Sequence, residues 1–381
     1  MSFRQGSAVS RVNCSTMAER SGSRSLAPAA PAQARSAVPL NTDDFDYPLD
    51  EELIAQRPLT DRAASRLLLV RRAGSFEDRA FKDISSLLVP GDVLVLNDTR
   101  VFPARLLGKK PTGASAEVLL LNSLDADGER WRALVRPGGK LKPGRKVRVA
   151  DDLEVEIEDS LEGGARIVRL LTQLPPFEAV LRFGRVPLPP YIRREDDEAD
   201  RQRYQTVYAR HRGSVAAPTA GLHFTEGMLE TIRAAGVTIV EITLHVGPGT
   251  FRPVEVPDPA NHRIDAEWCE VTEMAAAAIN RVRAEGGAVW AVGSTTVRTL
   301  ETMVDDAGVV CSGACKTDLF IRPGYQFRAV DRLITNFHLP RSTLLMLVAA
   351  FAGYDLSMAA YRHALEARYR FYSYGDAMAV I

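Results

Sequence analysis

Polar residues follow several of the apolar strands that this chain predicts, at the point where each strand ends. The clearest case is the apolar run Val93 to Leu96, which passes directly into Asn97-Asp98-Thr99-Arg100. Leu244 to Phe251, Val292 to Arg298 and Ile334 to Pro340 have the same design. Buried strands that end in polar side chains are typical of a sheet that presents ligand-binding groups along one edge. We expect the fold to be built around such a sheet.

The C-terminal half alternates predicted helices with predicted strands. Thr225 can cap a helix from Glu226 to Ala235, which Gly236 ends, and Val237 to Val246 predicts a strand. The alternation continues to Ala352. This pattern favours an α/β fold, a mostly parallel sheet with flanking helices.

A different pattern occupies residues 105–186, where short alternating segments are separated by Gly, Pro and Asp turns. Strands this short and regular predict an inserted small β-barrel domain. The proline-rich stretch from Val186 to Ile192 then excludes a helix interior and predicts an extended linker. Residues 43–104 and 187–381 would therefore form one α/β catalytic domain.

The first 42 residues contain five arginines, a single acid (Glu19) and many Ser and Ala residues, without hydrophobic periodicity. They predict a disordered N-terminal tail. An organellar transit peptide or a wrongly chosen start codon would have the same composition, and both alternatives stay open.

Composition limits the class of protein. The chain has 381 residues, 48 basic and 48 acidic, so any nucleic-acid contact must be local. Its four cysteines are too scattered for a disulfide framework, and its longest apolar run, Leu344 to Ala352, is too short to span a membrane. Without a heptad pattern or an exposed strand pattern, we expect a cytoplasmic monomer with no membrane span.

Three of the six histidines, His223, His245 and His338, lie in or beside the polar segments. Imidazole is well suited to proton transfer near neutral pH, although each of these side chains could equally orient a substrate. His223 precedes the Thr225 helix, whose positive end could stabilise negative charge beside it. The glycines and asparagines of the same segments could serve only turns and strand ends.

The stretch Gly293-Ser294-Thr295-Thr296, between a strand and a helix, could hold a phosphate or carboxylate on helix N-terminal N–H groups. It lacks the spacing of the Walker and dinucleotide glycine motifs. Arg298 could add a bidentate contact to that anion, or could form a surface salt bridge instead.

His262, Asp265 and Glu267 offer a possible metal-ligand set within six residues. Their spacing matches no standard zinc or iron pattern, which favours a polar or substrate-contacting loop, and we expect no metal site.

Residues 105–150 carry eleven Lys or Arg against four acids, a local excess that could meet RNA phosphates. The acidic run that follows cancels this excess, so a solvated β domain is nearly as well supported. A second basic strip is made of Arg193, Arg194, Arg201, Arg203, Arg210 and Arg212.

Several long motifs resemble, in order, those of the S-adenosylmethionine:tRNA ribosyltransferase-isomerase family. They are Asn97 to Arg105, Pro187 to Ile192, Pro218 to Phe224, Thr243 to Phe251, Thr335 to Pro340 and Tyr374 to Met378. The resemblance spans about residues 44–378. Two departures are Asp265, where a second histidine is expected, and Ser294-Thr295-Thr296, where Thr-Thr-Ser is commoner.

The resemblance implies that S-adenosylmethionine is a co-substrate, with no separate cofactor. Its ribosyl part would pass to 7-aminomethyl-7-deazaguanine at the tRNA wobble position, giving epoxyqueuosine tRNA and releasing adenine and methionine. We expect His223, His245 and Asp98 to transfer protons. The expected substrate-binding residues are Asn97, Thr99, Arg100, Pro218, Thr219, Gly221, Gly247, Thr250, Ser294, Thr295, Arg298, Asn336 and His338.

Two other classes of protein remain as alternatives at this point. One is an RNA-binding β domain attached to an inactive scaffold, and the other is an ordinary S-adenosylmethionine methyltransferase, which would need a glycine-rich loop after the first strand. Release of adenine would separate all three classes.

Overall fold

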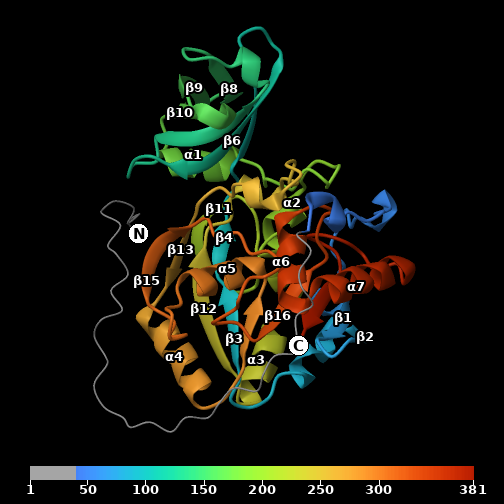
Figure 1. The fold of residues 1–381 in the computed structure, drawn as a ribbon. Helices are drawn as coiled ribbons and strands as arrows, with labels where there is room; N and C mark the ends of the chain where they lie inside the picture. Colours follow the sequence, from blue (N-terminus) through green and yellow to red (C-terminus); the bar gives the residue numbers. More distant parts are fainter. Residues whose placement is uncertain (1–39) are drawn as a thin grey trace.

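A computed structural model describes residues 40–381 as a sheet with helices on both faces and a separate barrel above it (Figure 1). The predicted tail therefore lies outside the described residues, except for its last three residues. Of these, Thr42 is buried, and its hydroxyl donates to the Val256 carbonyl at 2.6 Å. The described fold thus includes the end of the segment assigned to the tail.

The main sheet has nine strands in the order β15-β13-β12-β3-β14-β16-β17-β1-β2. The strands are β1 (Arg66–Arg71), β2 (Ser75–Ala80), β3 (Val93–Asn97), β12 (Thr238–Leu244), β13 (Glu267–Val271), β14 (Val289–Val292), β15 (Gly313–Thr317), β16 (Arg332–Asn336) and β17 (Ala377–Val380). Neighbouring strands are parallel from β12 to β16 and between β17 and β1. The other four pairs are antiparallel.

The prediction of a mostly parallel sheet is therefore wrong, because the sheet is mixed. Only its centre follows the strand–helix alternation of the sequence. At one edge, β1 and β2 form a hairpin whose turn contains Gly74 at φ +101°. The C-terminal strand β17 then inserts between β16 and β1 and runs antiparallel to β16, an arrangement that depends on contacts distant in sequence.

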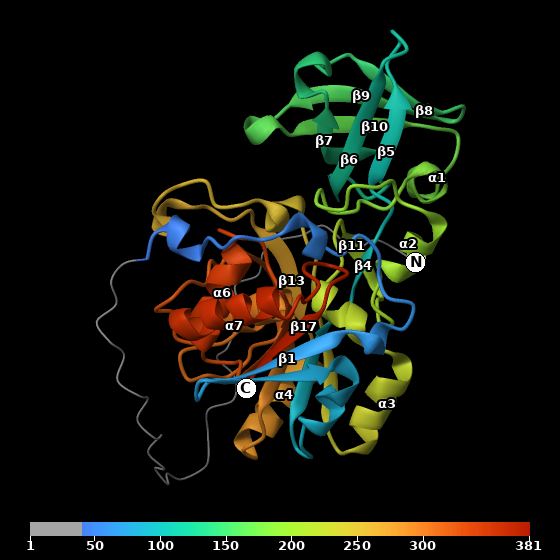
Figure 2. The ribbon, with the colours of Figure 1, turned by 90° about the vertical axis from the view of Figure 1, so that its right-hand side faces the viewer.

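Helices cover both faces of this sheet, as Figures 1 and 2 show. One face carries α4 (Glu273–Ala284), α5 (Ser294–Thr302), α6 (Thr343–Ala352) and α7 (Tyr354–Glu366), and the other carries α3 (Glu226–Ala234). In β3, Val93 and Val95 belong to the core under α4 to α7, whereas Leu94 and Leu96 belong to the core under α3. Burial on both faces explains the continuous apolar run of β3.

The helix ends follow local sequence. The predicted cap Thr225 accepts a hydrogen bond from Met228 N at 3.2 Å, and Gly236 follows α3 at φ +83°. Thr272 and Ser342 cap α4 and α6 in the same way. Side chains that accept from the first free N–H groups fix where these helices begin.

The predicted barrel is present and closes in the order β10-β7-β6-β5-β8-β9. Its strands are β5 (Arg105–Lys109), β6 (Ser115–Ser123), β7 (Arg130–Arg136), β8 (Lys146–Ala150), β9 (Leu153–Ser160) and β10 (Arg166–Leu171). Alternate side chains fill its interior, among them Val118, Leu120 and Trp131, and α1 (Pro176–Phe183) packs against the same core. A closed sheet of this size needs its own apolar interior.

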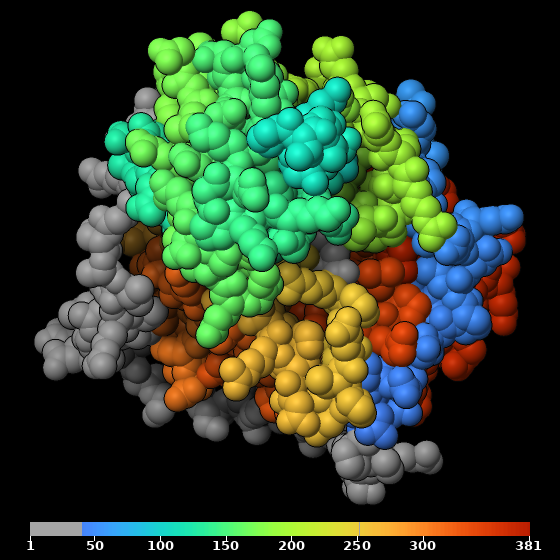
Figure 3. All heavy atoms as spheres, turned by 90° about the horizontal axis from the view of Figure 1, so that it is seen from above, coloured from blue at the N-terminus to red at the C-terminus, as the bar shows by residue number. Residues whose placement is uncertain are grey.

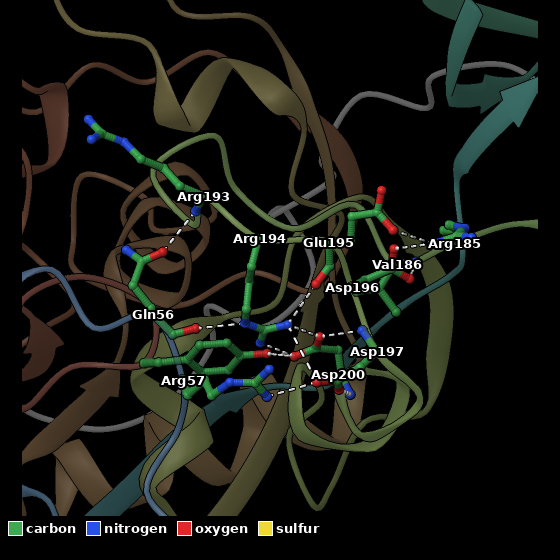
Figure 4. Close-up of polar contacts among 11 residues, drawn as sticks. Gln56, Arg57, Arg185, Val186, Arg193, Arg194, Glu195, Asp196, Asp197 and Asp200 are labelled. Atoms are coloured by element: carbon green, nitrogen blue, oxygen red, sulfur yellow. Dashed lines mark hydrogen bonds and ion pairs between the residues drawn. The ribbon is translucent and has the colours of Figure 1, made fainter. Parts of the chain in front are cut away.

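The chain returns from the barrel to the body through residues 184–197 and then α2 (Glu198–Arg203). Figure 4 shows the polar contacts that fix this return, with Arg194 at their centre. Arg194 makes two hydrogen bonds to Asp200, at 2.6 and 2.7 Å, and donates to the Gln56 carbonyl at 3.0 Å. Gln56 in turn donates to the Tyr191 carbonyl at 3.0 Å. The linker is thereby held against the body on both sides.

Between residues 40 and 381, no single helix has both the length and the apolar character needed to cross a membrane. The pair α6 and α7 meets that test only when taken together, with a bend of 116° between the two helices.

Candidate functional site

A pocket lies where the central strands end, on the face that carries α5 and α6. Its volume, including the space at its open mouth, is about 630 Å³. Its walls come from the ends of β14 and β16, from the start of α5, and from the 217–220, 246–250 and 372–373 segments. We call this the central pocket. Of the residues predicted to bind substrate, it contains Pro218, Thr219, Thr250, Ser294, Thr295, Asn336 and His338.

Helix α5 begins at one wall of the central pocket without a side-chain cap. Its preceding residue, Gly293, has φ +89° and donates its N–H to the Ile334 carbonyl at 2.7 Å. The positive φ turns the chain sharply out of β14, which brings Ser294 and Thr295 to the pocket. An uncapped helix start with small hydroxyl residues suits an anionic group such as a carboxylate.

Asn97 does not itself line the central pocket, because its side chain is fully buried and its amide is bonded within the protein. The amide donates to the Leu244 carbonyl and to the Thr295 hydroxyl, both at 3.1 Å, and accepts from Leu244 N at 3.0 Å and Thr99 N at 3.1 Å. Asn97 therefore positions Thr295 and ties β3 to β12.

Asn336 has a similar role on the opposite wall. Its amide accepts from the Thr219 hydroxyl at 2.9 Å and donates to the Tyr372 carbonyl at 3.1 Å. These bonds join the end of β16 to two loops of the central pocket. Tyr372 itself has φ +69°, an uncommon backbone conformation for a large side chain.

Aromatic rings close one side of the central pocket. The rings of Tyr191, from the linker, and Tyr372 lie 4.6 Å apart at 41°, and Phe337 also lines the pocket. The Tyr191 and Ser373 hydroxyls are 2.5 Å apart. An aromatic ring exposed at a pocket wall suits a stacked heterocycle.

His338 is the one histidine that lines the central pocket. Its Nε2 lies 2.8 Å from the Thr335 hydroxyl, and its Nδ1 has no hydrogen-bond partner among residues 40–381. Burial lowers the pKa of His338 to about 3. The ring is therefore neutral at neutral pH, with one nitrogen that donates a hydrogen bond and one that accepts.

A second polar group lies on the other face of the sheet, around Asp98. This carboxylate is buried; it accepts from the Thr243 hydroxyl at 2.7 Å and lies 2.8 Å from Nδ1 of His211. His211 is 63% exposed and belongs to β11 (His211–Ser214), which pairs with β4 (Thr99–Val101). The carboxylate fixes the orientation of an exposed imidazole, whose Nε2 faces away from that bond.

His245 belongs to the same second group, because its Nδ1 lies 2.8 Å from the Thr99 hydroxyl. Its ring stacks on Trp268, with centroids 5.0 Å apart, while Gly213 covers the ring so closely that a Cβ there would lie 2.5 Å from Nε2. Burial, with a smaller contribution from the charge of His211, lowers the pKa of His245 to about 4.

The structure gives no support to the predicted catalytic role of His223. Its Nδ1 lies 3.1 Å from the Ala220 carbonyl and its Nε2 2.9 Å from the Gly375 carbonyl, so both ring nitrogens face backbone oxygens, and the neutral ring donates to one of them. The ring stacks on Phe81 in the core, outside the central pocket. Burial lowers the pKa of His223. We assign His223 to packing, joining the 219–223 turn to the 375 loop.

The expected anion contact of Arg298 stays a prediction, because in the structure its guanidinium is bonded within the protein. Arg298 and Glu267 form a buried ion pair. Two other N–H groups of the guanidinium donate to the Leu319 carbonyl at 3.0 Å and to the Thr317 carbonyl at 3.3 Å. The other Glu267 oxygen accepts from Gly247 N at 2.7 Å and from the Thr250 hydroxyl at 3.2 Å. The pair therefore holds the 247–250 loop beside the central pocket.

Two further predicted residues, Arg100 and Gly221, do not line the central pocket. Arg100 is exposed on β4, away from the central pocket. Gly221 packs below Tyr208, whose hydroxyl would lie 2.0 Å from an added Cβ, so its smallness serves packing. Glu267 of the possible metal loop is committed to Arg298. Within residues 40–381, no group of three or more His, Cys, Asp or Glu side chains is arranged to hold a metal ion.

Sequence reasoning missed His211, Tyr191 and Tyr372 as site residues. In the sequence, His211 lies between Arg210 and Arg212 of the predicted basic strip, and no motif distinguishes it. Tyr191 belongs to the predicted extended linker, although an aromatic residue within a proline-rich segment is a signal for a binding surface. Nothing local in the sequence places Tyr372 beside Tyr191, because the two lie 181 positions apart.

The body has a pocket at the ends of its central strands beside a β-barrel, and this is where α/β proteins commonly bind small ligands. A family model described as "Queuosine biosynthesis protein" matches residues 42–380. The chain belongs to this family, which confirms the resemblance seen in its motifs.

Relatives agree with the family match. S-adenosylmethionine:tRNA ribosyltransferase-isomerase of Symbiobacterium thermophilum is 54% identical, over 90% of this chain and all of that protein. The enzyme of the same name from an Anaeromyxobacter species is 54% identical, over 89% and 98% of the two chains. A solved structure of S-adenosylmethionine tRNA ribosyltransferase from Thermotoga maritima is 39% identical, covers 89% of this chain and all of its own, and has a TM-score of 0.51.

Proposed function

We propose that this chain is a S-adenosylmethionine:tRNA ribosyltransferase-isomerase. It transfers and isomerises the ribosyl group of S-adenosylmethionine onto 7-aminomethyl-7-deazaguanine at the tRNA wobble position, giving epoxyqueuosine tRNA and releasing adenine and methionine. The observation that carries this proposal is 54% identity over the full length of a relative with that name. S-adenosylmethionine is the co-substrate, and the reaction uses no further cofactor or metal.

The central pocket supplies groups that suit such a donor. The uncapped start of α5, with Ser294 and Thr295, would hold the carboxylate of the methionine part. The rings of Tyr191 and Tyr372 would stack against the adenine. These two features lie on different walls, so one donor molecule could contact both while its ribosyl part lies between them.

Proton transfer is assigned to His338 in place of His223. The reaction needs a proton removed beside the sulfonium and a proton delivered to the departing adenine. His338 lines the pocket and is neutral at neutral pH, with one ring nitrogen held by Thr335 and the other available. The Asp98 and His245 group on the other sheet face would act on the RNA or on folding, because neither residue lines the pocket.

Adenine release tests the proposal. Purified protein is incubated with S-adenosylmethionine and a tRNA that carries the 7-aminomethyl-7-deazaguanine base, and adenine and the modified nucleoside are measured by mass spectrometry. We expect one adenine for each modified nucleoside. S-adenosylhomocysteine with a methylated nucleoside would show a methyltransferase, and no product with tight RNA binding would show a binding module. We further propose that the enzyme acts as a cytoplasmic monomer.

A further inference from the structure

A second and larger cavity lies between the barrel and the body. Its volume, including the space at its open mouth, is about 1280 Å³. Residues of both the barrel and the body line it. We call it the interdomain cleft. Figure 3 looks down on this end, where the green barrel, the yellow-green 187–203 region and the gold loop after β12 surround a hollow.

Arginines dominate the charge of the interdomain cleft. Arg105 and Arg136 come from the barrel, and Arg194 and Arg252 come from the body. Among residues 40–381, Glu117 is the one acid that lines the cleft, and it pairs with Arg105 at 3.1 Å. Arg136 is exposed and forms no ion pair among residues 40–381, although Glu117 lies opposite it in the pairing of β6 with β7. Its exposed guanidinium can therefore meet an anion from outside.

Apolar side chains make up much of the rest of the lining. They are Leu119, Leu134, Leu188, Ile192, Val215 and the prolines at 187, 189, 190 and 248. Arginines beside apolar and proline surface suit a polymer that is anionic along its backbone and flat and apolar at its bases. Single-stranded nucleic acid has this chemistry.

The cleft and the central pocket share their dividing wall. Along the linker, Pro190 and Ile192 line the cleft while Tyr191, between them, lines the pocket. Val215 lines the cleft, and Ala217, two residues further along the chain, lines the pocket. The wall is therefore one chain thick at these places, and a base lying in the cleft is close to the aromatic side of the pocket.

We propose that the interdomain cleft binds a single-stranded segment of the substrate RNA, the loop that carries the target base, with Arg136 contacting its phosphates. The target base then reaches the central pocket past Tyr191. The proposal rests on the proposed function, which supplies tRNA as the substrate. The linker contacts of Arg194 with Asp200 and Gln56 keep this wall in place before RNA binds (Figure 4).

Charge reversal at Arg136 tests the proposal. The matched control is Arg148→Glu. Arg148 lies on β8 opposite Lys109, which is at the other end of β5 from Arg105, and Arg148 does not line the cleft. Both arginines are exposed, and the Arg148 contact to Asp151 lies in solvent. Binding of a fluorescently labelled anticodon stem-loop RNA is measured by anisotropy at several salt concentrations, with the unfolding midpoint recorded for each variant.

We expect Arg136→Glu to weaken RNA binding roughly tenfold or more, and Arg148→Glu to change it by less than about twofold. Arg136→Ala should reduce the slope of log affinity against log salt by about 0.7 to 1, the loss of one phosphate contact. The KM for RNA should rise in Arg136→Glu, while the KM for S-adenosylmethionine stays unchanged.

Equal effects of the two charge reversals would mean that RNA contacts the barrel generally, and they would overturn the cleft assignment. Unchanged binding in a folded Arg136→Glu protein would overturn it as well. Failure of the proposed function has a different signature: the wild-type protein would bind the RNA in an Arg136-dependent way but release no adenine.

Discussion

The two faces of the central sheet carry similar polar residues at the same strand ends, but these residues lie in different surroundings. On the α5 face, Ser294, Thr295 and His338 line a pocket and keep groups available to a ligand. On the α3 face, Asp98 and His245 are bonded to Thr243, His211 and Thr99 and do not line that pocket.

This difference follows from the alternation of side chains along a strand. Asn97 and Asp98 are neighbours in sequence, yet Asn97 contacts Thr295 on one face and Asp98 contacts Thr243 and His211 on the other. A run of polar residues after a strand therefore predicts two sites on opposite faces, and only the packing on each face decides which one is open.

Replacing His338 should give the largest effect on catalysis. His338→Ala removes the imidazole from the central pocket, and we expect the saturated rate of adenine release to fall roughly 100-fold to 10,000-fold, the range for one general acid or base. The unfolding midpoint should change little by comparison. A stable variant with a normal rate would remove His338 from the mechanism.

A milder variant sharpens this test. Thr335→Val keeps the imidazole but removes the hydroxyl that lies 2.8 Å from its Nε2. A loss of rate smaller than that of His338→Ala is expected if Thr335 only orients the ring. An equal loss would mean that the hydroxyl itself contacts the substrate, since Thr335 also lines the pocket.

Breaking the buried Arg298–Glu267 pair should give the largest effect on stability. Arg298→Met leaves Glu267 as an unpaired buried charge, and we expect a loss of about 3 to 5 kcal/mol in the free energy of unfolding. The double variant Arg298→Met with Glu267→Leu should recover part of that loss, because both charges are gone. Urea unfolding measures both values, and a single variant as stable as wild type contradicts the structural assignment.

Local sequence was enough for the features that depend on neighbouring residues. The helix caps Thr225 and Gly236, the apolar core of β3 and the barrel all follow from capping, burial and alternation within short segments. The central pocket also contains seven of the predicted substrate-binding residues, because parallel strands in the middle of the sheet bring their ends together.

The remaining features depend on contacts between distant segments. The antiparallel insertion of β17 beside β16 cannot be inferred from the strand itself. Burial of Arg298 against Glu267 needs β13 and α5 to be adjacent, so a buried ion pair could not be distinguished from an anion contact. His223 looked available because its bonds to Ala220 and Gly375 are to backbone oxygens, which the sequence does not reveal.

His223 should affect folding and leave catalysis intact. His223→Ala removes the ring N–H that donates to one of the buried carbonyls, Ala220 or Gly375, which should cost about 1 to 3 kcal/mol of stability. At a temperature where the variant is folded, the saturated rate should stay within about threefold of wild type, in contrast to His338→Ala. A stable protein with a rate reduced 100-fold would restore the catalytic assignment of His223.

The last expected effect is a change in how stability depends on pH, which leaves stability at neutral pH unaltered. His245 titrates near pH 6.5 when unfolded, whereas burial lowers its pKa to about 4 in the folded protein. Between these values the unfolded chain binds the extra proton, so acid favours unfolding. The contribution of His245 is fully present above about pH 6.5 and is lost as the pH falls towards 4, by up to about 1.4 kcal/mol per pH unit.

His245→Gln isolates this contribution, because the variant keeps a polar group beside Thr99 but cannot titrate. His223 and His338 also have lowered pKa values and act in the same direction in both proteins. The measurement is therefore the difference in slope between wild type and variant, from urea unfolding at intervals between pH 5 and 7. We expect the slope of the unfolding free energy against pH to be smaller in the variant, by an amount that corresponds to about one proton. Identical slopes would mean that His245 is protonated in the folded protein, which its packing between Gly213 and Trp268 argues against.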